Sequence, residues 1–246
     1  MNPVSKIYLI VVIILFSSSL SAAQILTRTG YVRNPDDNSL LYTEHHYEVY
    51  IDNIVSMSSV IYKDKFGNAF AEKTVNFSSS PFLPEFSLQN KATGHQESTR
   101  YLDDGYEVRF LQRMNKKARE KSLDYSANAI SDAGFDNFVI SHWSQITKGE
   151  KFNRDFLIPG MLRFFKFRVY QAEVIEITGQ TYRMLVIEPD SFILRALSKP
   201  TRLYYAVDEP VLKKFKGISN MRDAEGNNYN VVIQYENKLP LVSTLN

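Results

Sequence analysis

Two histidine-containing segments hold the residues best suited to chemistry. The first is Glu44-His45-His46-Tyr47-Glu48. On a strand, Glu44, His46 and Glu48 share one face, with neighbours about 6.5–7 Å apart at the backbone. Two of them could share a metal ion, but zinc sites need three or four convergent ligands. The spacing therefore favours an exposed strand face on which one imidazole lies between two carboxylates, and we predict no metal.

The second segment, residues 134–150, reads GFDNFVISHWSQITKGE and places His142 directly before Trp143, the only tryptophan. A catalytic histidine would need a nucleophile or a carboxylate beside it. The spacing instead puts His142 on the apolar side of a helix. We interpret it as a neutral histidine, hydrogen-bonded in the core.

Motifs of catalysis are absent from the sequence. It contains no Gly-x-Ser-x-Gly, no glycine-rich phosphate loop and no His-Glu-x-x-His. It also has no cysteine, which excludes thiol chemistry, thiolate metal sites and disulfides. We predict no catalytic residue and no cofactor, and a hydrolase with a non-standard site is the least supported alternative.

One basic cluster, residues 113–121, carries five cations: Arg113, Lys116, Lys117, Arg119 and Lys121. Its position predicts a hairpin tip or a strand edge, where lysines discourage edge-to-edge pairing. The alternative is contact with anionic lipid head groups or with another envelope protein. No aromatic residue interleaves the cations, which argues against single-stranded nucleic acid.

Most of the chain alternates between apolar and polar residues with period two, as in segments 41–51, 106–112 and 229–236. Turn signals separate these segments at 34–38, 65–68, 103–105 and 224–228. The pattern predicts about ten to twelve half-buried antiparallel strands.

One segment breaks this rhythm with helical spacing. The apolar positions i, i+3, i+4, i+7, i+8 and i+11 are Phe135, Phe138, Val139, His142, Trp143 and Ile146. The pattern predicts one helix over about 132–147, capped by Ser131 or Asp132 and followed by Gly149. A lone amphipathic helix must lie on a sheet, and a long twisted sheet curls. We therefore predict a mainly β (α+β) fold, a single domain over 24–246: a long curved antiparallel sheet or open β-barrel with the helix in its concavity.

Aromatic residues are abundant, with 16 Phe and 15 Tyr, and gather in segments such as 164–170 and 203–207. They either pack a core or line an apolar cavity. The candidate cavity-lining residues are Phe135, Phe138, His142, Trp143, Phe165, Phe167 and Tyr205.

The N-terminus is typical of a signal peptide. Lys6 precedes an apolar run over 7–16, and the small residues Ser21 and Ala23 fit a cleavage site after residue 23. The run is too short for a bilayer span of about twenty residues. We predict an exported, periplasmic protein that is not an integral membrane protein after cleavage. The formal net charge is +2, which gives no reason to expect nucleic acid as a partner.

The order of these elements resembles that of periplasmic open-barrel proteins, including lipoprotein carriers of the Lol type. Segments 132–136 and 217–220 look like signatures of an uncharacterised exported Gram-negative family. The resemblance implies an open barrel and a lipid-like ligand, and carries over no catalytic residue.

Two functional hypotheses follow. The first is a binding or carrier protein for a lipid or another hydrophobic small molecule in the cell envelope. The second is a non-enzymatic envelope scaffold with a filled core that works by contact with another envelope protein.

Overall fold

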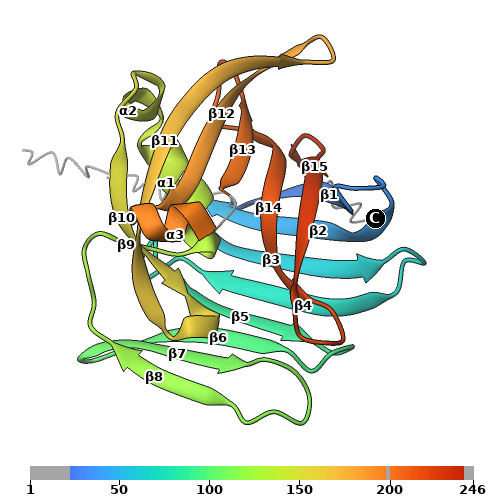
Figure 1. Ribbon diagram of the computed structural model, residues 1–246, viewed down its shortest axis with the longest axis vertical. Coiled ribbons are helices and arrows are strands. Elements are labelled where there is room, and N and C mark those ends of the chain that lie inside the picture. The colour runs from blue at the N-terminus through green and yellow to red at the C-terminus, as the bar shows by residue number, and fades with distance from the viewer. Residues whose placement is uncertain (1–22, 198–199, 241–246) are drawn as a thin grey trace, which may run out of the picture.

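Sixteen strands form one continuous sheet in the computed structural model, which describes residues 23–197 and 200–240 (Figure 1). The first eight strands are β1 (Gln24–Arg33), β2 (Leu40–Ile51), β3 (Ile54–Asp64), β4 (Ala69–Asn76), β5 (Glu85–Asn90), β6 (Gln96–Leu102), β7 (Gly105–Leu111) and β8 (Arg119–Leu123). The others are β9 (Ala129–Ile130), β10 (Phe152–Ile158), β11 (Arg163–Ile177), β12 (Gln180–Pro189), β13 (Thr201–Ala206), β14 (Leu212–Arg222), β15 (Asn228–Tyr235) and β16 (Leu239–Pro240). The predicted fold class is confirmed. The predicted strand number is too low, because two-residue strands such as β9 and β16 show no alternation.

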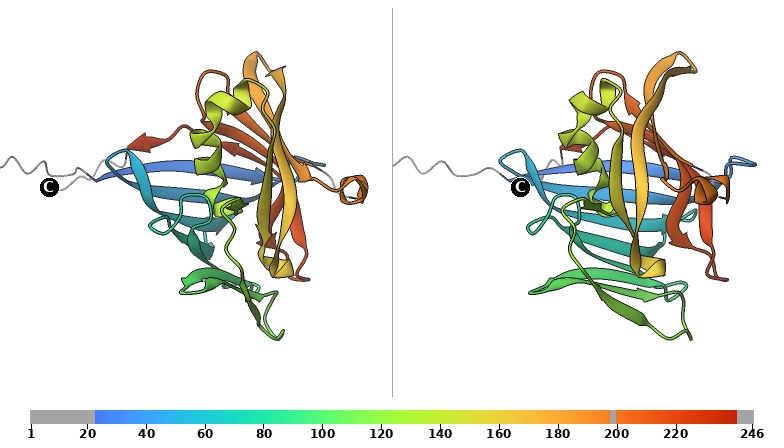
Figure 2. Two further views of the ribbon diagram at one scale, coloured as in Figure 1. Left: turned by 90° about the vertical axis from the view of Figure 1, so that its left-hand side faces the viewer. Right: turned by 60° about the vertical axis from the view of Figure 1, so that its left-hand side comes forward.

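The sheet has two halves that face each other. Strands β1 to β8 follow one another as antiparallel neighbours, β10 to β15 do the same, and β1 pairs with β15 to join the halves. The pairing of β9 with β10 is parallel. Figure 2 shows the C-terminal half folded over the N-terminal half, with the helical segment lying between them.

The helical segment occupies the predicted residues, 132–147, and is interrupted once within them. It consists of the 3₁₀ turn η1 (Asp132–Gly134), α1 (Phe135–Ser141) and α2 (Trp143–Thr147). At the break, His142 has φ −112° and ψ 15°. The Phe138 carbonyl accepts hydrogen bonds from both the His142 backbone N–H, at 3.1 Å, and the ring Nδ1, at 2.9 Å. A side chain that competes for the helical ladder in this way bends a helix.

Backbone contacts anchor the start of the helical segment in place of the predicted side-chain cap. Ser131 makes no capping hydrogen bond with its side chain, and its N–H donates to the Phe82 carbonyl at 3.0 Å. Gly134 lies against the same carbonyl, and a Cβ there would be 2.1 Å from the Phe82 oxygen. Only glycine fits so close an approach. At the other end, Gly149 follows the last turn with φ +94°, as predicted.

Two large apolar clusters fill the space between the halves. The helix cluster packs the helical segment on β11–β14 and contains Ile130, Phe135, Phe138, Val139, Ile146, Val169, Leu185, Ile187, Leu203, Tyr205 and Leu212. The strand cluster contains Val32, Tyr42, Val60, Tyr62, Ala71, Leu88, Met221, Val231 and Ile233. Four residues of the predicted apolar stripe are therefore buried, which places the core on the concave side.

Strands β8 and β9 are the two ends of the sheet, and no backbone ladder joins them within the described residues. Side chains close the gap: Leu83, Tyr106, Val108 and Leu123 pack with Ala129 and Leu157. The barrel is thus open in its hydrogen bonding and closed by apolar packing. The 112–118 turn joins β7 to the edge strand β8, which confirms the predicted hairpin tip of the basic cluster.

A third helix, α3 (Phe192–Leu197), links β12 to β13, and the sequence pattern does not predict it. Figure 2 places α3 on the side of the C-terminal half that faces away from α1 and α2. None of the described helices is long and apolar enough to cross a membrane. The predicted signal peptide falls on residues 1–23, of which 1–22 lie outside the described residues.

Candidate functional site

Strand β2 turns its charged face toward the concavity, contrary to the prediction of an exposed face. Glu44 is 6% exposed, and the His46 and Glu48 side chains are also largely buried. That prediction was wrong because neighbouring strands supply charged and hydroxyl partners that make burial of these side chains tolerable.

Arg28 lies beside this face, on β1, directly across from His46. Its side chain is 8% exposed. The Nη2 atom lies 3.9 Å from Glu48 Oε1 and 3.7 Å from Asp136 Oδ2. The guanidinium also lies over the Tyr235 ring, 4.7 Å from its centroid. Because Asp136 belongs to α1, the Arg28–Asp136 contact joins the helical segment to the sheet.

Glu48 has two closer partners than Arg28. It accepts hydrogen bonds from Lys238 Nζ at 2.6 Å and from the Tyr50 hydroxyl at 2.7 Å. Burial raises the pKa of Glu48, but the charges of Lys238 and Arg28 outweigh burial and hold the pKa below its usual value. Glu48 is therefore ionised at neutral pH.

Asp136 also has a closer partner than Arg28. Its Oδ1 accepts a hydrogen bond at 3.0 Å from the hydroxyl of Tyr205, which is fully buried in the helix cluster. Burial, and then the charge of Asp136, raises the pKa of Tyr205 well above its usual value, so the hydroxyl remains a donor. In the same way, the Tyr235 hydroxyl donates to Glu44 Oε2 at 3.2 Å.

These contacts leave Arg28 with two unsatisfied nitrogens. Its Nε and Nη1 are buried and have no hydrogen-bond partner among the residues that the structure describes. Burial opposes the charge on Arg28, but Asp136 and Glu48 outweigh burial and raise its pKa, so the guanidinium stays charged. Buried N–H groups without an acceptor are unfavourable, so this arrangement is suited to binding an oxygen acceptor. We refer to Arg28, Glu48, Asp136, Tyr205, Tyr235 and Lys238 as the Arg28 site.

The two segments that carry the family resemblance, 132–136 and 217–220, meet in the structure. Asp132 Oδ2 accepts hydrogen bonds from Lys73 Nζ at 2.8 Å and from Asn220 Nδ2 at 3.3 Å. Lys73 lies on β4 and is 6% exposed. Its contact with Asp132 is a second ion pair between the helical segment and the sheet.

Five of the seven predicted cavity-lining residues belong to the helix cluster or pack against it: Phe135, Phe138, Trp143, Phe167 and Tyr205. The His142 ring lies 4.4 Å from that of Phe138, between centroids. Phe165 lies under the Arg163 guanidinium and outside this cluster. The structure thus brings most of the set together as packed core, and their role in ligand binding stays a prediction.

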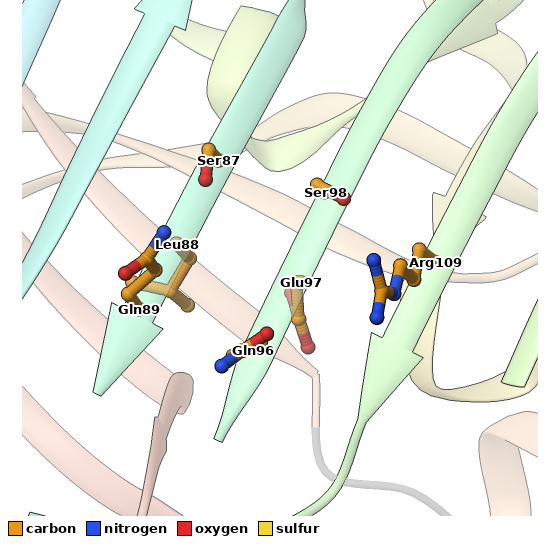
Figure 3. A pocket seen from close by; sticks show the side chains of 7 residues that line it. All are labelled: Ser87, Leu88, Gln89, Gln96, Glu97, Ser98 and Arg109. Carbon is orange, nitrogen blue, oxygen red and sulfur yellow. The ribbon is translucent and has the colours of Figure 1, made fainter. Parts of the chain in front are cut away.

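Two shallow hollows lie away from the helical segment. One, of about 140 Å³, lies on the outer face of β5–β7, where Figure 3 shows its lining residues Ser87, Leu88, Gln89, Gln96, Glu97, Ser98 and Arg109. The other, of about 560 Å³, lies beside the 3₁₀ turn η2 (Pro159–Met161) and is lined by Lys121, Leu123, Asp124, Met161, Leu162, Arg163 and Phe164. Neither is lined by any of the seven predicted residues.

The sequence pattern did not identify four residues of the Arg28 site: Arg28, Asp136, Tyr235 and Lys238. Alternation with the buried Val32 puts Arg28 on the concave face, and this is the one signal that could have identified it. The hydrogen bonds around the site join residues up to 191 positions apart in the sequence, which no local pattern reveals. In the described part of the chain, no three His, Asp or Glu residues converge to hold a metal ion.

No protein-family model matches the chain. No curated protein matches it either. A solved structure described as a β-barrel-like protein of the domain of unknown function DUF1849, from Brucella abortus, is 8% identical with a TM-score of 0.39, and the match covers 91% of this chain and 99% of that one. A DUF1329 family protein from Desulfovibrio piger is 8% identical with a TM-score of 0.29, covering 89% and 86%. At this level of similarity, neither structure assigns the chain a family or a function.

Proposed function

We propose that this chain is an exported, non-catalytic binding protein that holds the acidic head group of a lipid-like ligand at the Arg28 site. The observation that carries the proposal is the pair of buried Arg28 nitrogens, Nε and Nη1, that find no acceptor in the described part of the chain. Charged oxygens are the strongest acceptors for a guanidinium.

The charges around Arg28 favour a ligand with a single negative charge. Arg28 and Lys238 already face the carboxylates of Glu48 and Asp136, two positive charges against two negative ones. A doubly charged phosphate monoester would be repelled by both carboxylates more strongly than a singly charged fatty-acid carboxylate. We therefore propose a fatty-acid-like ligand.

Aromatic side chains continue from the Arg28 site toward the helix. Tyr205 contacts Asp136 with its hydroxyl and Trp143 with its ring, at a centroid distance of 5.7 Å. The apolar part of the ligand would follow this direction. Because the apolar stripe fills the concavity, a long chain requires the helical segment to separate from β11–β13. The Asp136–Arg28 contact, too long for a hydrogen bond, is the tie that a ligand carboxylate would replace.

The direct test is titration with laurate, followed by the fluorescence of Trp143, together with native mass spectrometry and lipid extraction of the purified protein. Arg28→Gln should weaken laurate binding at least about tenfold, because a charge-assisted contact is lost. Arg33→Gln is the matched control, since Arg33 lies on the same strand but bonds to the Asn38 carbonyl in a turn. Equal laurate affinity of Arg28→Gln and the unmodified protein would overturn the proposal.

The filled helix cluster favours a second function, that of an envelope scaffold that acts by contact with another envelope protein. Phe138, Val139 and Ile146 are fully buried, as expected of a permanent core. Purified protein that carries no lipid and has no affinity for laurate would support the scaffold and exclude the binding protein. Crosslinking in intact cells should then trap a protein partner.

Export is part of the proposal and rests on the residue pattern of the N-terminus. Intact-mass measurement of protein from the periplasmic fraction should show a chain that begins at Gln24. Recovery of the uncleaved chain in the cytoplasm would contradict export.

A further inference from the structure

We infer that the outer face of β12–β14, together with α3, docks the protein on an anionic lipid bilayer. We call Arg202, Lys214, Lys216, Phe192 and Ile193 the outer patch. It lies on the opposite side of the C-terminal half from the helical segment, and the inference does not depend on ligand binding at Arg28.

The cations of the outer patch share one face of the sheet. Leu203 and Phe215 point into the helix cluster, so the alternating residues Arg202, Lys214 and Lys216 point outward. Arg202 and Lys216 are direct cross-strand partners. Like charges in this position repel each other.

None of the three cations forms an ion pair with any residue that the structure describes. Lys214 lies over the Tyr204 ring, 5.5 Å from its centroid. Two other cations on the outer face are neutralised, since Arg168 pairs with Glu188 and Lys166 with Asp155. The outer patch therefore keeps an unbalanced positive charge that a negative surface would complement.

The helix α3 adds exposed apolar side chains beside these cations. Phe192 is 77% exposed and Ile193 is 68% exposed. Arg202 is the second residue of β13, the strand that follows α3, and Figure 2 shows α3 projecting from this outer side. Exposed apolar groups next to cations are typical of segments that lie in the head-group region of a membrane. An anionic bilayer complements both features, because its head groups attract the cations and its interfacial region accepts the apolar side chains.

The test is co-sedimentation of the protein with two kinds of vesicle, one of phosphatidylcholine alone and one that also contains phosphatidylglycerol. The protein is used in the form that the cell accumulates. We expect binding to the anionic vesicles that weakens with added salt. Reversing the three cations together to Glu should reduce the binding at least about tenfold. Phe192→Ser combined with Ile193→Ser should also reduce vesicle binding. It should leave the Tm of the protein unchanged, because both side chains are exposed.

Reversal of Lys116 and Lys117 to Glu is the matched control, because both are exposed cations in the 112–118 turn. It should leave vesicle binding within about twofold of the unmodified protein. As a second measurement, the fluorescence of Phe192→Trp should shift to the blue on addition of anionic vesicles. Three results would overturn the inference: no binding to anionic vesicles, equal losses in control and patch variants, or capture of an acidic protein by the patch in place of lipid.

Discussion

The Asp136 carboxylate lies 3.7 Å from Arg28 Nη2, across the boundary between α1 and β1. A second carboxylate of the same segment, Asp132, accepts a hydrogen bond from Lys73 on β4. Two contacts between charged side chains, in addition to the apolar stripe, therefore hold the helical segment over the concavity. The Lys73–Asp132 contact is a hydrogen bond, whereas the Arg28–Asp136 contact is too long for one. Within residues 23–197 and 200–240, Arg28 Nε and Nη1 have no acceptor.

Removing the Tyr205 hydroxyl should destabilise the fold. Tyr205→Phe deletes a buried hydrogen bond to the charged Asp136, and we expect a loss of about 1.5–3 kcal/mol in the free energy of unfolding. Urea unfolding, followed by the fluorescence of the neighbouring Trp143, measures it. Tyr182→Phe removes an exposed hydroxyl contact and should change the free energy by less than about 0.5 kcal/mol. Equal effects of the two variants would contradict this role of Tyr205.

Lys73 and Asp132 should be energetically coupled. In a double-mutant cycle with Lys73→Met and Asp132→Asn, we expect a coupling free energy of about 1 kcal/mol, since one partner is buried and the other is half exposed. Asp132→Asn alone should be the more harmful single change, because it leaves a buried ammonium without its counter-charge. A coupling of zero would show that the two segments merely touch.

Gly134→Ala should destabilise the protein by about 1–3 kcal/mol, because the new Cβ would overlap the Phe82 carbonyl oxygen. Thermal unfolding detects the loss as a lower Tm. Ala133→Ser, a change of similar size at the preceding residue, provides the comparison. Unchanged stability of Gly134→Ala would mean that the 77–84 loop can withdraw from η1.

Acidification should destabilise the fold through His46 before it does so through Glu48. Burial holds the pKa of His46 below its ordinary value of 6.5, so the unfolded chain binds more protons and the free energy of unfolding falls as pH drops below about 6.5. The pKa of Glu48 is also lowered, and its contribution is present above its ordinary value of 4.5 and is lost as pH falls through the lowered pKa.

Urea unfolding over this pH range measures the effect. His46→Gln should remove part of the decrease in the free energy of unfolding between neutral pH and about pH 5, where only histidines titrate. His45→Gln should remove less, because burial also lowers the pKa of His45 but His45 is less deeply buried than His46. If His46→Gln keeps the full pH dependence, another group causes it.

Local periodicity predicts the apolar stripe because Phe138, Val139 and Ile146 need only helical spacing to share a face. It cannot predict the break at His142, where a ring nitrogen competes for the Phe138 carbonyl. Nor does it predict α3, which spans only six residues and shows no periodicity.

Alternation in β2 separates Glu44 and His46 from His45 but does not say which face is inside. That choice depends on Arg28, Tyr235 and Lys238, whose contacts require the register of β1 and β2 and the pairing of β1 with β15 and β16. The Arg28 site is assembled by long-range topology, and this is why the sequence pattern predicted an exposed face there.

Laurate titration of two variants that should change the affinity in opposite directions tests the central claim most directly. Arg28→Gln should weaken laurate binding, whereas Asp136→Asn should strengthen it several-fold, because it removes the competing carboxylate and keeps an acceptor for Tyr205. Circular dichroism of both variants confirms that each is folded. Opposite shifts in affinity are the predicted result, and laurate affinities that do not change, or that fall equally in both variants, would contradict the account.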